Sequence, residues 1–289
     1  MYPGTFEYHR AASVKEALDL LKQFGDDAKL LSGGHSLIPM MKLRLAQPAH
    51  LVDIAKIAGL GQIAEQGGKI IVGAAATHSQ VASSELLRNR LGLLAECAAA
   101  IADVQVRNRG TIGGSLSHAD PAADYPAAVL ALEGEFHLES EAGARTVKAE
   151  DFFLDIMTTA LRPSEILTQA SFAPIAAGAG FAYLKHRQPA SGFAMVGVAA
   201  LITLDRKGNF AQARVGVTGL GAKAFRARAI ETALTGKPAD AATITAAAAH
   251  TADGIDALVD IHAGAEFRAE LARVYARRAL QAAVARTKA

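Results

Sequence analysis

Two glycine-rich segments are the residues of this chain that most plainly suggest a bound cofactor. The first, at residues 32–36, reads Ser-Gly-Gly-His-Ser, and the second, at residues 111–115, reads Thr-Ile-Gly-Gly-Ser. Each offers consecutive backbone N–H groups without bulky side chains in front of them, which is the arrangement that binds a phosphate. A single such segment is as easily an ordinary tight turn. Two segments with similar endings are better explained by one diphosphate held from two sides, as in a dinucleotide-type cofactor.

Polar side chains after the second segment extend this hypothesis. Asp120 and Asp124 lie in the stretch His-Ala-Asp-Pro-Ala-Ala-Asp at residues 118–124. A carboxylate here could accept hydrogen bonds from ribose or ribityl hydroxyls, and it could equally cap the next helix. His118 and Asp120 are suitable metal ligands, but no third ligand accompanies them at a convincing spacing, and no His-Glu-x-x-His motif occurs. We therefore predict no metal site.

Other candidate motifs are weaker. Residues 219–224 match the fingerprint G-x-G-x-x-A, but the next strand and the acidic residue about 20 positions later are missing, which argues against nicotinamide binding there. No phosphate-binding loop of the G-x-x-x-x-G-K type occurs. Arg107 and Arg109 could attract anions or could simply be solvated loop cations. Cys97 lies in an apolar helical pattern and is predicted to be a core residue.

Short strands and helices alternate around the first segment. A strand at 6–8 precedes a helix that begins after Ser13, in the capping-box pattern Ser-Val-Lys-Glu, and ends at Gly25. Strands at 29–31 and 51–53 flank a short helix around Pro39. The first glycine segment is therefore expected to connect a strand to a helix.

The second segment lies between predicted helices over 84–102 and 125–132. Gly67 and Gly68 separate two apolar runs and indicate a hairpin over 65–71. Further expected elements are a second hairpin over 135–147 that turns at 141–143, strands at 166–172, 181–185, 195–204 and 210–218, and alanine-rich helices to the C-terminus. Residues 174–180 are small and uncharged, which makes them the best linker candidate.

The predicted fold class is α+β with two domains. The first covers residues 1–175, with subdomains at about 1–55 and 56–175, and the second covers residues 176–289. Of the 289 residues, 51% are hydrophobic and 20% charged, which excludes disorder and fibrous repeats. Thirty basic and 28 acidic residues give a net charge of +2 without a basic block, so nucleic acid is not an expected partner.

Hydropathy and cysteine content narrow the function further. No apolar run reaches the roughly 18–20 residues of a membrane span, and the N-terminus lacks the basic region and apolar core of a signal peptide. We therefore predict no transmembrane segment and a cytoplasmic location. One cysteine can form neither an intramolecular disulfide nor an iron–sulfur cluster within this chain. Redox chemistry would thus depend on a bound organic cofactor.

Four motifs together resemble a known family. They are Pro-Gly-x-Phe at 3–6, Ser-Gly-Gly-His-Ser-Leu-Ile-Pro at 32–39, Val-Gln-Val-Arg-Asn at 104–108 and Thr-Ile-Gly-Gly-Ser at 111–115. In this combination they are similar to the FAD-binding medium subunits of molybdenum hydroxylases, above all those of the carbon monoxide dehydrogenase type. The resemblance covers essentially the whole chain. It implies an FAD-binding domain of the vanillyl-alcohol-oxidase (PCMH) type in two subdomains, followed by a C-terminal three-stranded sheet with a helical bundle.

The resemblance also implies which residues contact FAD. Both glycine segments would hold the pyrophosphate, and Asp124 matches the family's aspartate after the second segment. Leu161 matches an adenine-side backbone contact, Lys185 a lysine near the flavin ring, and Phe193 a loop aromatic against the isoalloxazine. No catalytic residue is implied. The full predicted set is Lys29, Leu31, Ser32, Gly33, Gly34, His35, Ser36, Leu37, Ile101, Thr111, Ile112, Gly113, Gly114, Ser115, His118, Asp124, Leu161, Lys185 and Phe193.

From the same resemblance we expect non-covalent FAD, with the molybdenum cofactor and 2Fe–2S clusters held only by partner subunits. The chain would receive electrons from the nearer cluster and pass them to an external acceptor, whether quinone, NAD or oxygen. Its expected partners are a large molybdopterin-binding subunit and a small 2Fe–2S subunit, in a dimer of heterotrimers. The alternative is a self-contained FAD-dependent oxidase or dehydrogenase. The substrate stays open among carbon monoxide, an aldehyde, a purine and another N-heterocycle.

Overall fold

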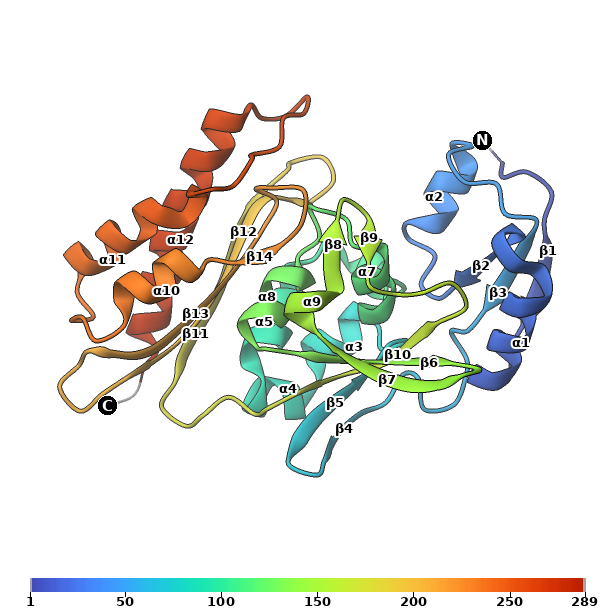
Figure 1. The fold of residues 1–289 in the computed structure, drawn as a ribbon, viewed down its shortest axis with the longest axis horizontal. Helices are drawn as coiled ribbons and strands as arrows, with labels where there is room; N and C mark the ends of the chain where they lie inside the picture. Colours follow the sequence, from blue (N-terminus) through green and yellow to red (C-terminus); the bar gives the residue numbers. More distant parts are fainter. Residues whose placement is uncertain (1, 288–289) are drawn as a thin grey trace.

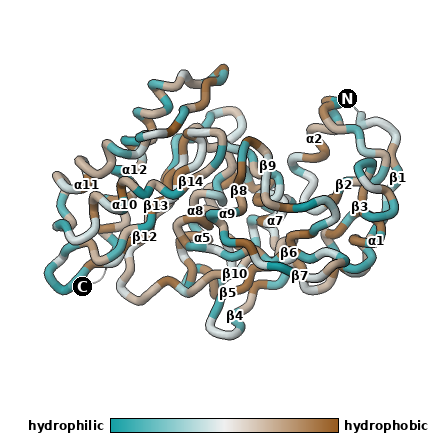
Figure 2. Tube along the Cα trace, viewed as in Figure 1, coloured by the Kyte–Doolittle hydropathy of each residue, from teal (hydrophilic) through white to brown (hydrophobic). Residues whose placement is uncertain are grey.

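The computed structural model describes residues 2–287, which form three successive parts (Figure 1). The chain runs from a small N-terminal part at the right of the view, through a central part, to a C-terminal part at the left. The three parts contain a three-stranded, a five-stranded and a four-stranded sheet respectively. Hydrophobic stretches occur in all three (Figure 2), and each part has its own cluster of buried apolar side chains. This is the predicted α+β arrangement.

The N-terminal part is a parallel sheet in the order β1-β3-β2 with two helices. Its elements are β1 (Glu7–Arg10), α1 (Val14–Phe24), β2 (Ala28–Leu31), α2 (Leu37–Lys42) and β3 (His50–Asp53). The helix bounds are confirmed, because the Ser13 side chain accepts a hydrogen bond from the Glu16 N–H and Gly25, with φ 53°, ends α1. The predicted capping box is only half formed, since the Glu16 carboxylate accepts from the N–H of Ala12 and not of Ser13. The first glycine segment connects β2 to α2, as expected.

The central part is an antiparallel sheet in the order β4-β5-β10-β6-β7, covered by helices. Its strands are β4 (Ile63–Gln66), β5 (Lys69–Gly73), β6 (Glu135–Ser140), β7 (Gly143–Lys148) and β10 (Ile166–Phe172), with β8 (Phe153–Asp155) and β9 (Thr158–Thr159) forming a separate pair. Its helices are α3 (His78–Ser83), α4 (Glu85–Arg90), α5 (Gly92–Ala100), α6 (Val104–Arg107), α7 (Ile112–His118), α8 (Tyr125–Ala131) and α9 (Ala149–Phe152). Both predicted hairpins are present.

One predicted element differs. The long helix expected over 84–102 is divided into α4 and α5 at Leu91, whose φ of −145° and ψ of 44° interrupt the helical path. Leu91 itself is buried, and a Cβ atom added at Gly92 would overlap the ring of Phe181. The break therefore comes from packing against a strand about 90 residues further along the chain, which no local pattern could reveal.

The C-terminal part is an antiparallel sheet with helices on one face. Its elements are β11 (Gly180–Arg187), β12 (Ala194–Leu204), β13 (Phe210–Thr218), β14 (Phe225–Arg226), α10 (Arg228–Leu234), α11 (Ala241–Ala248) and α12 (Ala265–Ala285). The three expected strands are present, and the two-residue β14 adds a fourth at the edge. The buried side of α12 is formed mainly by Ala272, Ala276, Ala279 and Ala283, so the helix packs closely on the sheet.

Close contact also joins the C-terminal sheet to the central part. Helix α8 packs against β12 and β13, and a Cβ atom at Gly216 would overlap the carbonyl group of Ala127. The predicted linker at 174–180 connects the two sheets, and the domain boundary within it remains a prediction. Among residues 2–287, no helix has both the length and the apolar composition needed to cross a bilayer.

Candidate functional site: the cavity between the two glycine segments

A cavity of about 710 Å³ lies where the N-terminal and central parts meet, and both glycine segments line it. Its size lies within the usual range for cofactor and ligand sites. Further lining comes from residues 161 and 163–167 and from residues 191–193, which include Phe193. The structure thus brings together nearly all of the residues predicted to bind FAD, the exceptions being Ile112 and Lys185. Which of them touch the cofactor remains a prediction.

The first glycine segment presents a row of unpaired donors. Within residues 2–287, the backbone N–H groups of residues 33–37 have no hydrogen-bond partner. Gly34 has φ 74°, which lets the chain turn sharply, and the ring nitrogen Nδ1 of His35 lies 3.0 Å from the Gly33 carbonyl oxygen. These five consecutive N–H groups have the arrangement that was predicted for binding a phosphate.

The second segment differs from its prediction, because the backbone N–H groups of residues 112–115 are already used. Those of Ile112 and Gly113 donate to the carbonyl oxygens of Ala76 and Ala74, at 3.0 and 2.8 Å. The N–H groups of Gly114 and Ser115 are satisfied within the first turn of α7, the former by the Thr111 hydroxyl at 3.2 Å. What this segment offers the cavity is therefore mainly hydroxyl groups.

The glycines of the second segment serve packing instead. A Cβ atom at Gly113 would overlap the Ala74 side chain and lie 2.7 Å from its carbonyl oxygen, whereas one at Gly114 would meet only the Thr111 hydroxyl, at 2.9 Å. Neither glycine has a positive φ. Ile112 is 1% exposed because its side chain packs into the central core, so its side chain does not line the cavity, and its place in the cofactor site stays a prediction.

The two segments also contact one another directly. The hydroxyl oxygens of Ser32 and Thr111 lie 3.1 Å apart. A Cβ atom at Gly33 would overlap the Arg109 carbonyl oxygen and lie 2.7 Å from the Cα atom of Gly110. Only glycine at position 33 allows this approach. The first segment therefore packs directly against the second segment and the two residues before it.

Asp124 and Lys185 form a buried ion pair next to the cavity. Their Oδ1 and Nζ atoms are 2.7 Å apart, and both side chains are only 4% exposed. The Tyr183 hydroxyl donates to the same carboxylate oxygen at 2.5 Å. Asp124 makes no capping hydrogen bond at the start of α8, which removes that alternative. Burial raises the pKa of the Asp124 carboxyl, and the Lys185 ammonium opposes that rise.

Lys185 is not itself a lining residue, but its ammonium group contacts Asp124, which lines the cavity, so its expected position near the flavin ring stays a prediction. Its ammonium group also donates to the Gly192 carbonyl oxygen at 2.7 Å, so it holds the loop that carries Phe193. The Phe193 side chain is 44% exposed and lines the cavity. The sequence pattern alone did not identify Ser191 and Gly192 as lining residues, although their position beside Phe193 was a usable signal.

His78 is a lining residue that the sequence did not reveal. Its ring lies against Gly110 and its Nδ1 atom is 3.3 Å from the Tyr125 hydroxyl. Burial, with smaller contributions from His35 and Arg107, lowers the pKa of His78 to about 4, so the ring is neutral near pH 7. No motif marks it, because its partners come from distant segments.

The weaker sequence candidates are Arg107, Cys97 and residues 219–224. Arg107 donates to the Ile101 and Ala102 carbonyl oxygens at 2.7 and 3.1 Å, so it fixes the local backbone. Cys97 is a buried core residue as predicted, and burial raises the pKa of its thiol. Residues 219–224 form a bend that leads to β14, and the next helix begins only at Arg228.

Comparison with known proteins defines the class to which this architecture belongs. Residues 4–172 match the family described as FAD binding domain in molybdopterin dehydrogenase. Residues 181–283 match the CO dehydrogenase flavoprotein C-terminal domain. The chain belongs to this family of FAD-binding flavoproteins, as its motifs had indicated.

Individual relatives are similar over their whole length. The chain is 41% identical over 287 residues to the carbon monoxide dehydrogenase medium chain of Hydrogenophaga pseudoflava, covering 99% of both. It is 35% identical to the 6-hydroxypseudooxynicotine dehydrogenase complex subunit alpha of Paenarthrobacter nicotinovorans, covering 100% of this chain and 97% of that protein. The solved carbon monoxide dehydrogenase from H. pseudoflava that lacks the Mo-pyranopterin moiety matches with a TM-score of 0.97 at 43% identity, over 100% of both chains. These similarities confirm the predicted fold and the oxidoreductase class.

The residues of the cavity fit FAD. A pyrophosphate carries the negative charge and acceptor oxygens that a row of five unpaired N–H groups would bind. Ile101, Leu161 and Phe193 also line the cavity, and they provide the apolar surface that aromatic rings need.

Proposed function

We propose that this chain is the electron-transfer subunit of a molybdenum hydroxylase, with FAD bound non-covalently between its two glycine segments. The observation that carries the proposal is the row of unpaired N–H groups at residues 33–37 on the wall of a cavity of about 710 Å³. FAD bound there supplies the redox chemistry, accepting electrons from 2Fe–2S clusters of a partner and releasing them to quinone, NAD or oxygen.

The chain's own residues bind and orient the cofactor. The first segment donates hydrogen bonds to the pyrophosphate, while the second keeps the first in place through the contact between Ser32 and Thr111. Lys185 holds the loop of residues 191–193 through the Gly192 carbonyl, which places Phe193 at the flavin end. No residue of this chain acts as acid or base on the substrate of the complex.

The partners follow from what this chain lacks. Its one cysteine, Cys97, is buried in the core and cannot ligate a cluster. We therefore assign the clusters to a partner chain. As the family resemblance implies, we propose a small 2Fe–2S subunit and a large molybdopterin-binding subunit, in a cytoplasmic dimer of heterotrimers. Two full-length relatives carry names for different substrates, carbon monoxide and 6-hydroxypseudooxynicotine. This supports recognition of the substrate by another subunit.

The cofactor assignment is tested on the purified complex. Acid precipitation should release all of the flavin into the supernatant, and chromatography should identify it as FAD. Flavin that stays in the pellet would contradict non-covalent binding. FMN in the supernatant would contradict the assignment of a diphosphate to the two segments.

The electron-transfer role needs a separate test that does not depend on the unknown substrate. The complex is reduced with dithionite under anaerobic conditions and then mixed with benzoquinone, NAD or oxygen. The iron–sulfur clusters, followed by their visible absorbance, should be re-oxidised quickly in the complete complex. In a complex from which the flavin has been removed, their re-oxidation should be slow. Equal rates would overturn the role. Turnover of carbon monoxide, an aldehyde or a purine by this chain alone would favour the self-contained oxidase instead.

A further inference from the structure

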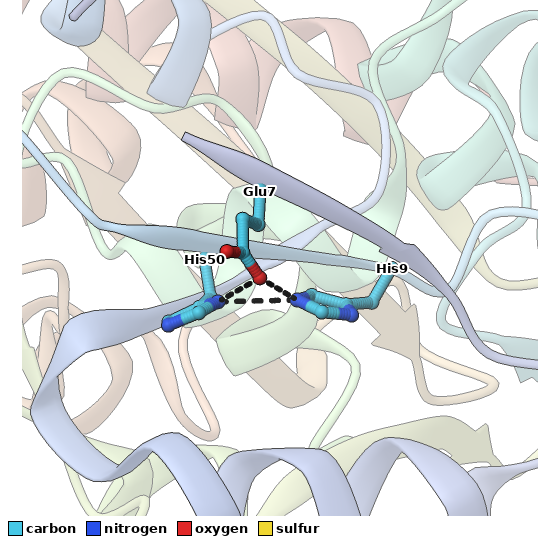
Figure 3. Close-up of side chains that lie close together, drawn as sticks. All are labelled: Glu7, His9 and His50. Carbon is cyan, nitrogen blue, oxygen red and sulfur yellow. Dashed lines mark hydrogen bonds and ion pairs between the residues drawn. The ribbon is translucent and has the colours of Figure 1, made fainter. Parts of the chain in front are cut away.

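Glu7, His9 and His50 form a cluster on the N-terminal sheet, and none of the three is among the residues that line the cofactor cavity (Figure 3). The parallel pairing of β1 and β3 sets Glu7 opposite His50. Because side chains alternate along a strand, His9 lies on the same face as Glu7, while Tyr8 lies on the other face and donates to Asp53. Among residues 2–287, this is the one group of three potential metal ligands whose atoms lie within 4.8 Å of one another.

The three ligand atoms have the spacing that a small metal ion requires. His9 Nε2 lies 3.1 Å from His50 Nδ1, and the Glu7 Oε2 atom lies 3.8 and 3.5 Å from these two nitrogens. A triangle with these sides has a circumscribed radius of about 2.0 Å, so a single point lies at that distance from all three atoms. Zinc binds imidazole nitrogen at about 2.0–2.1 Å and carboxylate oxygen at about 2.0–2.2 Å.

Without an ion, the cluster has too few donors. A neutral imidazole carries one N–H, and an ionised carboxylate only accepts hydrogen bonds. A hydrogen bond between the two ring nitrogens uses one N–H and one lone pair, so neither nitrogen has a proton left to donate to the Glu7 oxygen at the point that the three atoms surround. A cation at that point would satisfy all three atoms at once.

Phe24, the last residue of α1, holds both rings in place. Its ring stacks on His50 with centroids 3.8 Å apart and planes 12° apart, and on His9 with centroids 4.9 Å apart and planes 29° apart. The side chains of His9 and His50 are 24% and 18% exposed, whereas that of Glu7 is 72% exposed. The nitrogens are therefore fixed on the protein side, and a fourth coordination position faces the solvent.

We propose that Glu7, His9 and His50 bind one divalent first-row transition ion, with zinc as the best match, completed by a water molecule. Two imidazoles select against Mg²⁺ and Ca²⁺, which prefer oxygen ligands. The ion joins β1 to β3, and β3 also pairs with β2, the strand that leads into the first glycine segment. The proposal replaces our prediction of no metal site, since the ligands lie on two strands 41 residues apart and form no local motif.

The test uses the full chain, freed of metal with EDTA and titrated calorimetrically with zinc sulfate near neutral pH. We expect one saturable site, and Co²⁺ at the same site should show the visible bands of a tetrahedral complex. His9→Gln and His50→Gln should each weaken zinc binding by at least about 100-fold, and Glu7→Gln by about 10-fold. The control is His262→Gln, which alters an exposed histidine in the loop before α12 and should leave the affinity unchanged.

Thermal unfolding without zinc separates a lost ligand from a lost fold. Each variant should unfold close to the wild-type temperature. At one zinc concentration, added zinc should raise that temperature fully in the wild type and in His262→Gln, less in Glu7→Gln, and least in the two histidine variants. If either histidine variant does not fold, the exposed Glu7→Gln variant decides. Several weak sites, or unchanged affinity in the folded cluster variants, would overturn the proposal.

Discussion

The two glycine segments look alike in sequence but have different structural roles. In the first, Gly34 adopts φ 74° and five consecutive N–H groups have no partner within the described residues 2–287. In the second, every N–H of residues 112–115 is bonded, and Gly113 is needed because Ala74 leaves no room for a side chain. A Gly-Gly pair can therefore mark either donors offered to a ligand or close packing of the protein against itself.

The difference follows from what surrounds each segment. The second is fixed by the backbone of residues 74–78, which belongs to the large central core. The first belongs to the N-terminal part, whose cluster of buried apolar residues is smaller. It contacts the second segment region through Ser32 and Gly33. A substitution that disturbs the second segment should therefore also displace the first, whereas a substitution in the first should leave the second unchanged.

The largest effect is expected for Gly113→Ala. Its methyl group would overlap Ala74, so the free energy of unfolding should fall by about 3 kcal/mol. Gly61→Ala is a matched control, because its nearest neighbour would lie 4.0 Å away and its φ is not positive. Urea unfolding of both variants measures the difference. Similar stabilities would show that the second segment is not tightly packed against Ala74.

The pH dependence of stability should reveal the burial of the His78 ring next to the second segment. The folded chain keeps this ring neutral to about pH 4, while the unfolded chain takes up a proton below about pH 6.5. Stability should therefore be lost as the pH falls from about 6.5 to about 4, by about 3 kcal/mol. His78→Gln should remove this slope and His262→Gln should not. A slope that persists in His78→Gln would assign the effect to other groups.

A pair of substitutions compares the segments as cofactor sites. Gly34→Ala strains a left-handed residue and displaces N–H donors, so FAD affinity should fall about 100-fold, equivalent to two charge-assisted hydrogen bonds. Gly114→Ala should weaken FAD by less than about 10-fold, because the N–H at 114 is already bonded to Thr111. Fluorescence titration of the apoprotein measures both. The reverse order would place the main phosphate donors in the second segment.

The smallest effect concerns the hydrogen bond between the segments. Ser32→Ala should cost about 1 kcal/mol of stability or less. Combining it with Thr111→Val in a double-mutant cycle should give a coupling energy of about 0.5–1 kcal/mol. A coupling energy of zero would mean that backbone packing at Gly33 alone holds the segments together.

The sequence predicted the elements whose signals are local. The helix start after Ser13, the Gly67-Gly68 hairpin and the strand at 166–172 all appear as expected, since turn and cap chemistry acts over a few residues. The resemblance to a family gave the cavity and most of its lining, because it covers the whole fold.

What the sequence could not predict depends on contacts between distant segments. The break at Leu91, the inward direction of Ile112 and the pairing of Lys185 with Asp124 are all set by packing partners far along the chain. The same holds for the N–H groups of Ile112 and Gly113, whose acceptors lie about 40 residues earlier. A pattern shows which groups are available, and tertiary structure decides how they are used.

The buried pair of Asp124 and Lys185 bears on how such proteins can be divided or recombined. The carboxylate belongs to the half that precedes the linker at 174–180, and the ammonium belongs to the half that follows it. Separating the halves would leave a charge without its counterpart on each side. A nick in the linker should thus yield two fragments that stay associated, and exchange of one half between relatives would have to preserve both members of the pair. The pair thus couples the two regions that match separate family models.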